Sequence, residues 1–364
     1  MTPLSPALEK SRIPPIWCLM PVLADPFATT AAISDLLAQT VPTRVLVVNQ
    51  GVDEDFRQRL ERLAEEYPDR VFVWHHQPPL LSLSATWNRA LDFVWEQAEQ
   101  TEGNPDEWVA LVVNNDVRLH RATVQVLSTV LRRTESLFVS AVGVHEENWF
   151  PDVVDQLAAH WLSPDDGTPI GKGGPDFSCF LISWQCHRRW RFDEAFIPCF
   201  AEDLDCHRRM MLGGDGERIF SINMPYLHLA SNTLKTLPPE QANRIRHQIE
   251  TISRAYYAKK WGGAVNQETF WTPFGQQTDR DPDIAMLKLI DQPTTPKLQA
   301  YVQQRALTPT LTDFDARDKL MGDDFSDKVM AAGYRAQADA LDPARGWTDA
   351  DHLRALGQPE DLDE

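Results

Sequence analysis

The chain is organised around the stretch Trp108-Val109-Ala110-Leu111-Val112-Val113-Asn114-Asn115-Asp116-Val117. Its unbroken apolar run, residues 109–113, is rich in β-branched side chains, which is typical of a strand buried on both faces of a parallel sheet. The run stops at Asn114, Asn115 and Asp116. Ligands of open α/β sheets bind beyond the carboxyl ends of the strands, so the pattern predicts that these side chains reach a binding crevice. Asn and Asp also favour ordinary turns, which is the competing interpretation.

Short apolar runs alternate with helical patterns on both sides of this stretch. Helical spacing of apolar residues is found at 29–40, 53–67 and 122–133, and the segment 80–94 predicts a further helix with Ser84 as its N-cap. Strands are predicted at 16–22, 44–51, 71–74 and 137–142. Regular alternation of strand and helix builds a parallel sheet. The predicted fold class is therefore α/β, a doubly wound, mostly parallel sheet with helices on both faces.

The second half of the chain is less regular. Residues 145–174 are aromatic, acidic and glycine-rich, with one short helix predicted at 153–161, and they form a candidate active-site loop. Strands are predicted at 177–183 and 219–229, and helices at 202–212 and 240–260. Beyond Pro273 the composition becomes polar and acidic. We predict one domain over residues 1–275 and a mainly helical C-terminal extension over 276–364, which is a candidate lid or site of self-association into a homo-oligomer.

The helix at 202–212 begins with Glu202, Asp203 and Asp205. Backbone N–H groups and the helix dipole favour ionised carboxylates there, so an acid directed into a crevice is ready to accept a proton. Acidic residues are also simply good first-turn residues. Asp205 is predicted to form a solvated pair with Arg208 or Arg209. His228, near the end of a predicted strand, is either a metal ligand or a buried core histidine.

The composition limits the class of protein. The chain has 364 residues, with 35 Lys and Arg against 53 Asp and Glu, a net charge of −18 that argues against sequence-independent binding to nucleic acid. It lacks a long apolar run, and residues 1–15 lack a signal pattern, which favours a cytoplasmic protein. The five cysteines lack zinc-site spacing and are expected to be reduced, buried hydrophobes. Gly171-Lys172-Gly173-Gly174 lacks the Lys-Ser/Thr pair of a P-loop, which favours a flexible substrate loop instead.

Taken in order, the motifs between residues 14 and 274 resemble the family 2 glycosyltransferases of the GT-A fold. Each motif alone is weak, but their order is specific. The matching positions are Pro21, Asn49-Gln50-Gly51, Asn88 within 85–91, Asn114-Asn115-Asp116, the strand region 174–183, Phe200-Ala201-Glu202-Asp203-Leu204-Asp205, His228, and Lys260-Trp261-Gly262-Gly263 with Glu268, Phe270 and Pro273.

The resemblance implies a role for each of these residues. Asp116 and His228 would hold Mg²⁺ or Mn²⁺ against the two phosphates of a nucleotide-diphosphate sugar. Asp203 would be the general base that deprotonates an acceptor hydroxyl, which implies inversion at the anomeric carbon. Glu202 would position the acceptor or take the base role itself. The donor nucleotide would be bound by Pro21, Asn49, Gly51, Asn88, Asn114 and Asn115.

The sequence departs from the family at two positions. Where the family usually has an acid that holds the donor base, this chain has Asn49. An amide can hydrogen-bond but carries no charge, so the identity of the base stays open. The metal motif begins with Asn114 instead of an acid, which leaves one carboxylate ligand in that motif.

Other functions compete with this interpretation. A sugar-phosphate nucleotidyltransferase would need a glycine-rich, basic loop after the first strand, which residues 19–25 do not provide. A non-catalytic sugar-nucleotide-binding or scaffold protein is suggested by Asn49 and Asn114. The acceptor is expected to be a hydroxyl-bearing glycan. A hydroxylated nucleic-acid base, held by aromatic residues such as Trp149, Trp161 and Trp184, is the lesser option because of the charge of −18.

Overall fold

The computed structural model describes residues 15–99, 107–163, 175–229 and 232–275. The chain divides into two compact units. Among the described residues, the first unit contains 15–78, 86–99, 107–163, 175–191, 218–229 and 232–238, and the second contains 79–85, 192–217 and 239–275. The predicted loop at 171–174 and the predicted extension at 276–364 lie outside the described residues. The domain boundary at residue 275 therefore stays a prediction.

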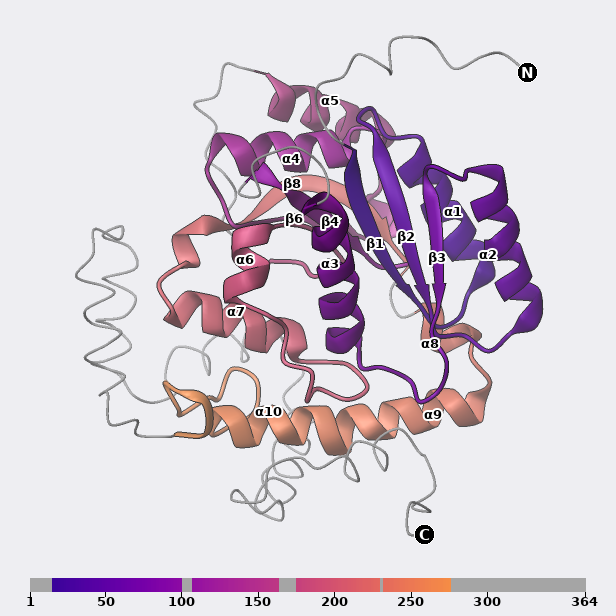
Figure 1. Ribbon diagram of the computed structural model, residues 1–364. Coiled ribbons are helices and arrows are strands. Elements are labelled where there is room, and N and C mark those ends of the chain that lie inside the picture. The colour runs from indigo at the N-terminus through magenta and orange to yellow at the C-terminus, as the bar shows by residue number, and fades with distance from the viewer. Residues whose placement is uncertain (1–14, 100–106, 164–174, 230–231, 276–364) are drawn as a thin grey trace, which may run out of the picture. The chain divides into compact units, whose positions relative to one another are not determined.

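The first unit is built on a sheet whose strand order is β3-β2-β1-β4-β7-β6-β8-β5 (Figure 1). Strands β1 to β4 run parallel, β7 is antiparallel to both β4 and β6, and β5 is antiparallel to β8. The α/β prediction is confirmed, and the sheet is parallel in its first half and mixed in its second. The strands are β1 Ile16–Val22, β2 Thr43–Asn49, β3 Val71–His75, β4 Val109–Val113, β5 Val117–Arg118, β6 Phe138–Val144, β7 Cys179–Ser183 and β8 Ile219–His228.

Helices cover both faces of this sheet, as predicted. Successive strand residues point to opposite faces. On one face Cys18 and Met20 of β1 share a core with residues of α1, α2, α4 and α5. On the other, the ring of Trp17 lies 6.1 Å from that of Phe93 on α3. The helices of this unit are α1 Pro26–Leu37, α2 Glu54–Glu66, most of α3 Leu83–Glu99, α4 Thr123–Arg133, α5 Pro151–Leu162, α6 Trp184–Arg189 and α8 Asn232–Thr236.

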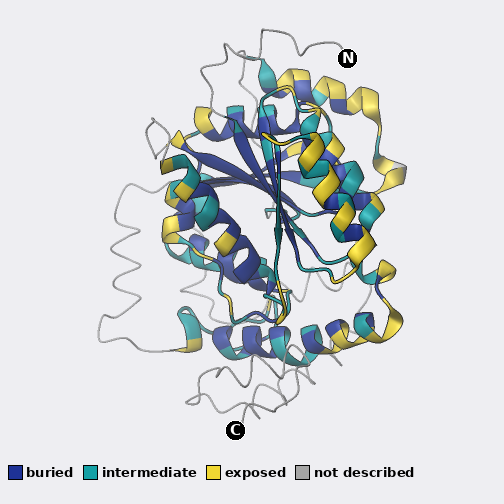
Figure 2. Ribbon diagram, turned by 45° about the vertical axis from the view of Figure 1, so that its right-hand side comes forward, coloured by how far each residue is buried: buried dark blue, intermediate teal, exposed yellow. Residues whose placement is uncertain are grey.

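The burial of the strands agrees with their apolar composition. All five residues of β4 are buried, as the run at 109–113 predicts. In Figure 2 the strands are largely buried, whereas the helices expose residues on their outer turns. The five cysteines are free, and all but Cys199 are buried, in agreement with the expectation from spacing. No helix in the described ranges is long and apolar enough to cross a membrane.

The predicted cap of α3 is wrong by two residues. Ser82 caps this helix, since its Oγ accepts a hydrogen bond from the N–H of Ala85 at 3.1 Å. Ser84 lies inside the helix and is fully buried. The sequence offers a serine at both positions, and helical spacing alone does not separate them. Asp25 and Asp53 cap α1 and α2 in the same way, through the N–H groups of Ala28 and Phe56.

The second unit consists mainly of helices. Helix α7, Glu202–Leu212, ends at Gly213, as predicted. The predicted helix at 240–260 is present as α9 Pro239–Gln248 and α10 Arg254–Trp261, joined by a π-helical turn at Ile249–Ser253. A short 3₁₀ turn follows at Pro273–Gly275. The core of this unit is aromatic and contains Phe196, Ala201, Tyr256, Tyr257 and Trp261.

His207 on α7 makes the stability of the chain sensitive to acid. Burial lowers the pKa of its imidazole from 6.5 to about 4. Between these values the unfolded chain binds a proton that the folded chain does not, so the free energy of unfolding falls as the pH drops. Between pH 7 and pH 5 the free energy of unfolding should fall by about 1 to 2 kcal/mol less in His207→Gln than in the wild type, because the variant lacks this titrating group. Urea titrations at both pH values measure this difference, and an equal loss in wild type and variant would contradict it.

Candidate functional site

Asp116 and His228 meet at the carboxyl edge of the sheet in the first unit. The loop after β4 leads into β5, where Val117 pairs with His228 at the end of β8. His228 Nε2 lies 3.6 Å from Asp116 Oδ1, with the carboxylate side chain 6% exposed and the imidazole side chain 25% exposed. The hydrogen bond to Asp116 raises the pKa of His228 in spite of burial. The structure therefore brings together the two residues that the sequence predicts as metal ligands.

Asn115 connects the metal motif to two neighbouring segments. Its Nδ2 donates to the carbonyl of Ala24 at 2.8 Å and to Thr29 Oγ1 at 2.9 Å. Its Oδ1 accepts from Thr233 Oγ1 at 3.2 Å. The amide of Asn115 thus fixes the loop after β1 and helix α8 around the motif. Asn114 donates its backbone N–H to the carbonyl of Ser178 at 2.9 Å, and its side chain is only half-buried.

The predicted donor-binding residues at the end of β2 and in the loop after it form an internal network. Asn49 is fully buried. Its Oδ1 accepts from the N–H of Gly51 at 2.9 Å, and its Nδ2 lies 3.1 Å from His75 Nδ1. A Cβ on Gly51 would lie 2.6 Å from the carbonyl oxygen of Leu23, so only glycine permits this close approach of the loops after β1 and β2. These contacts support an orienting role for Asn49 and Gly51.

The other two predicted donor-binding residues also lie in the first unit. Pro21 is half-buried in β1, paired in register with Val48 of β2. Asn88 is buried on α3. On the same helix, Thr86 Oγ1 accepts a hydrogen bond from Gln50 Nε2 at 2.9 Å, which joins α3 to the loop after β2.

Sequence reasoning missed Asp176 and His75. Asp176 accepts hydrogen bonds from the N–H groups of Ser178 at 2.9 Å and Gly143 at 3.0 Å, and its charge contributes to the raised pKa of His228. The sequence signal for Asp176 is its position after Gly-Pro, before a strand, where Asp favours a turn. His75 ends β3, and its pKa is lowered, chiefly by burial. Its pairing with Asn49 depends on strand register, which the sequence does not specify.

Glu202 and Asp203 occupy the first turn of α7 in the second unit. The two residues before them, Phe200 and Ala201, have left-handed backbone angles, with φ of 84° and 70°. Glu202 is 4% exposed, and its buried Oε2 has no hydrogen-bond partner among the described residues. Burial, and next the charge of Asp203, raise the pKa of Glu202 well above its usual value. Asp203 is half-buried and accepts from the N–H of Leu204 at 2.7 Å.

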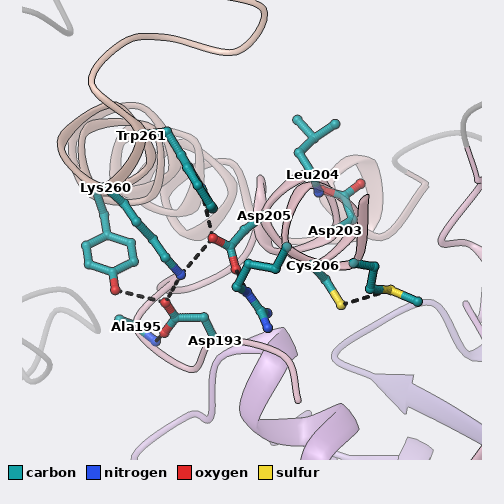
Figure 3. Close-up of polar contacts among 11 residues, drawn as sticks. Asp193, Ala195, Asp203, Leu204, Asp205, Cys206, Lys260 and Trp261 are labelled. Carbon is teal, nitrogen blue, oxygen red and sulfur yellow. Dashed lines mark hydrogen bonds and ion pairs between the residues drawn. The ribbon is translucent and has the colours of Figure 1, made fainter. Parts of the chain in front are cut away.

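Asp205 is not the solvated residue that its helical spacing predicts. It is fully buried and accepts hydrogen bonds from Arg209 Nε at 2.7 Å and Trp261 Nε1 at 2.9 Å. Lys260 Nζ lies 2.7 Å from Asp205 and 2.5 Å from Asp193 (Figure 3). The prediction of a solvated pair is wrong because α10 covers this side of α7. The result is a network of two acids, Asp193 and Asp205, and two bases, Arg209 and Lys260, in which Asp205 and Lys260 are buried and Arg209 and Asp193 are partly buried.

The aromatic residues proposed to hold a nucleic-acid base do not form one group. Trp161 of α5 is buried in the core, and its Nε1 donates to the carbonyl of Asn223 at 3.2 Å. Trp149 packs against the same core. Trp184 instead lies 5.3 Å from Trp95 of α3, ring centroid to centroid. The predicted aromatic cage is therefore wrong, because these side chains serve the packing of different helices.

Comparison with known proteins gives only distant likenesses. No family model matches the chain, and no curated protein is similar to it in sequence. Similar solved structures include the mannosyltransferase PcManGT of Pyrobaculum calidifontis in complex with GDP-Man and Mn²⁺, with 13% identity and a TM-score of 0.43 over 95% of this chain and 87% of that one. S. aureus TarS has 15% identity and a TM-score of 0.42, over 65% of this chain and 42% of its own. Glucosyl-3-phosphoglycerate synthase of Mycobacterium tuberculosis, in complex with phosphoglyceric acid, has 14% identity and a TM-score of 0.39, over 67% and 79%.

Proposed function

We propose that this protein is a metal-dependent, inverting glycosyltransferase that moves a sugar from a nucleotide diphosphate to an acceptor hydroxyl. The observation that carries the proposal is the convergence of Asp116 and His228, which are far apart in the sequence, at the carboxyl edge of the sheet. In open α/β sheets this edge is where ligands bind. The ordered motifs of the sequence support the same activity.

The donor set suits Mn²⁺ or Mg²⁺. A carboxylate and an imidazole are ligands that Mn²⁺ accepts, and Mg²⁺ is commonly held by one or two protein ligands together with phosphates and waters. No group of three or more His, Cys, Asp or Glu side chains suited to a metal is found in the described ranges, so Asp116 and His228 would leave most positions to the diphosphate and water. When bound, such a cation neutralises charge on the departing diphosphate.

The two acids of α7 are proposed to act on the acceptor. Asp203, half-buried in the first turn, is favoured in its ionised form by the helix dipole and can accept the proton of the attacking hydroxyl. Glu202 has an unpaired, buried carboxylate oxygen and a raised pKa, which suit a protonated group that donates a hydrogen bond to the acceptor. Attack on the face opposite the diphosphate inverts the anomeric carbon.

Donor contacts are proposed for the side chains that the internal network leaves accessible. Asn114 and Pro21 are half-buried at the carboxyl edge of the sheet. Asn49, Gly51 and Asn115 are proposed to support the donor site by holding its loops, and Asn88, buried on α3, is proposed as a further residue of the donor site. The acceptor is proposed to be a hydroxyl-bearing glycan.

The loop after β1 also bears on the nucleotidyltransferase alternative. Asp25 in this loop is buried and accepts from the N–H of Ala28 at 3.0 Å as the cap of α1. A nucleotidyltransferase would place glycines and a base where this chain has Leu23, Ala24 and an acid. The non-catalytic alternative predicts nucleotide binding without turnover, which an assay of donor hydrolysis separates from the proposal.

The test of the proposal is a panel of nucleoside diphosphates and nucleotide sugars, each with and without Mn²⁺, measured by thermal shift and then by calorimetry. We expect at least one nucleotide to bind only when Mn²⁺ is present, and its sugar to be transferred to water or to an added alcohol. Binding that is equally tight in EDTA would contradict the metal assignment, and the absence of binding to the whole panel would contradict the function.

Asp116→Ala and His228→Ala are each expected to weaken Mn²⁺-dependent nucleotide binding by at least about 10- to 100-fold, because removal of even an outer-shell partner of a metal ligand typically costs that much. Calorimetric titration of the nucleotide at saturating Mn²⁺ measures the change. His120→Ala is the matched control, because His120 also pairs with an aspartate, Asp155, at 3.0 Å. Equal losses in the control and in His228→Ala would show that the effect is not specific to the predicted metal ligands.

A further inference from the structure

The segment that leads into α7 is irregular and firmly held. Phe200 and Ala201 are successive non-glycine residues in the left-handed region. Such backbone is strained and persists only where surrounding contacts impose it, commonly at functional sites. The long helix that faces this segment within the second unit also carries an irregularity, the π-helical turn at Ile249–Ser253. π-turns inside α-helices are likewise frequent at functional sites.

The end of the π-turn contacts the strained segment at two points. Ser253 is fully buried, and its Oγ donates to the carbonyl of Ile197 at 2.9 Å. The guanidinium of Arg254 lies 4.2 Å from the centroid of the Phe200 ring, a cation–π contact. Phe200 remains 37% exposed, so burial of its ring does not by itself explain its position. On the other side, Leu83 donates its N–H to the carbonyl of Pro198 at 2.8 Å.

The strained segment in turn sets the position of the acids. The backbone N–H of Phe200 donates to the carboxylate of Glu202. The carbonyl of Ala201 accepts from the N–H of Asp205 at 2.9 Å and so begins α7. A change in the backbone at Phe200 would therefore move the first turn of α7, which carries Glu202 and Asp203.

We propose that Ser253 and Arg254 are positioning residues that hold the turn at 197–201 and thereby fix the carboxylates of Glu202 and Asp203. The inference rests on the proposed function for its effect on catalysis. Its structural part, the placement of Glu202, can be measured without activity. A misplacement of about 1 Å is enough to cost on the order of 100-fold in rate when reacting groups must be aligned.

The test uses Arg254→Met, which keeps the length of the side chain but removes its charge, and Arg254→Lys, which retains a cation over Phe200. Arg246→Met is the matched control, since Arg246 lies on the same long helix, is exposed, and its Nη1 donates to Asn243 Oδ1 at 3.1 Å. Two quantities are measured in the full chain: kcat and KM for hydrolysis of the nucleotide sugar that binds best with Mn²⁺, and the pH midpoint of carbodiimide labelling of Glu202 by mass spectrometry.

We expect Arg254→Met to lower kcat about 10- to 100-fold, with the donor KM within about twofold of wild type because the donor contacts are unchanged. The labelling midpoint of Glu202 should fall toward that of an exposed carboxyl, since the released turn lets water reach it. Arg254→Lys should restore most of both values, and Arg246→Met should change neither.

The proposal is overturned if Arg254→Met leaves kcat and the labelling midpoint unchanged. It is also overturned if kcat falls together with the melting temperature while the midpoint stays the same, because the residue would then be merely structural. If the wild-type protein hydrolyses no nucleotide sugar, the proposed function fails. In that case an unchanged midpoint in Arg254→Met still overturns the positioning role, and a lowered midpoint still supports it.

Discussion

Asp203→Asn is expected to lower the rate of sugar transfer by about 10²- to 10⁴-fold, the usual contribution of a general base. The amide has nearly the shape of the carboxylate but cannot accept the proton of the attacking hydroxyl. Mn²⁺-dependent nucleotide binding should stay within about twofold of wild type, because Asp116 and His228, the proposed metal ligands, are unchanged. Single-turnover transfer from the best nucleotide sugar measures the first effect and calorimetry the second.

Glu202→Gln is the informative comparison. If Glu202 acts as a protonated hydrogen-bond donor, an amide at this position still donates, and the rate should fall by about tenfold or less. A larger loss in Glu202→Gln than in Asp203→Asn would assign the base to Glu202 instead. Asp152→Asn serves as the control, since Asp152 is also a first-turn acid but lies on α5 and is exposed. Transfer at the wild-type rate in Asp203→Asn would remove Asp203 from the mechanism.

The regular part of the fold was predictable because its signals are local. β4 follows from five adjacent apolar residues, and α2 from a helical stripe containing Phe56 and Leu60 behind the cap Asp53. The antiparallel course of β7 was not predictable. An apolar run such as 179–183 specifies a buried strand, but its direction depends on which strands lie beside it. β5 is only two residues long and has no periodicity to detect.

Some features of the candidate site were likewise predictable from the sequence, and others were not. The order of the motifs identified Asp116 and His228 as partners, and the structure places them 3.6 Å apart. The hydrogen-bond partners of the Asn49 side chain could not be predicted from the sequence. They are the N–H of Gly51 and the ring of His75 on the next strand. The unpaired oxygen of Glu202 was also hidden, because an acid in a first turn looks the same whether it is exposed or buried.

The prediction that Asp205 forms a solvated pair is wrong for a clear physical reason. Helical spacing correctly pairs Asp205 with Arg209, at 2.7 Å. It gives no sign that Lys260 and Trp261, more than fifty residues later, cover the same carboxylate. A pair that would contribute little on a surface therefore becomes part of a buried network, in which the removal of one partner has a large effect.

Lys260→Met is accordingly expected to destabilise the protein by about 3 to 5 kcal/mol, the cost of breaking a buried ion pair. Lys260 is 4% exposed and its Nζ contacts both Asp193 and Asp205, the latter fully buried. Methionine fills much of the same volume as lysine and leaves no large cavity. The loss of stability would therefore come from the carboxylates of Asp193 and Asp205, which lose the positive charge of Lys260. Urea unfolding of the full chain measures it. Lys259→Met, one residue away and half-buried, is the matched control and should cost less than about 1 kcal/mol.

The origin of the loss can be separated by a double-mutant cycle with Asp193→Asn. Asp193 keeps its hydrogen bonds to Tyr256 and to the N–H of Ala195 when Lys260 is removed, but its charge is left without the cation that lowers its pKa. Asp193→Asn should therefore destabilise the wild-type chain and restore part of the stability of Lys260→Met, because it removes a negative charge that has lost its partner. Additive losses in the double variant would mean that Lys260 stabilises α10 through packing of its aliphatic stem, and the ion network would then not be what joins α7 to α10.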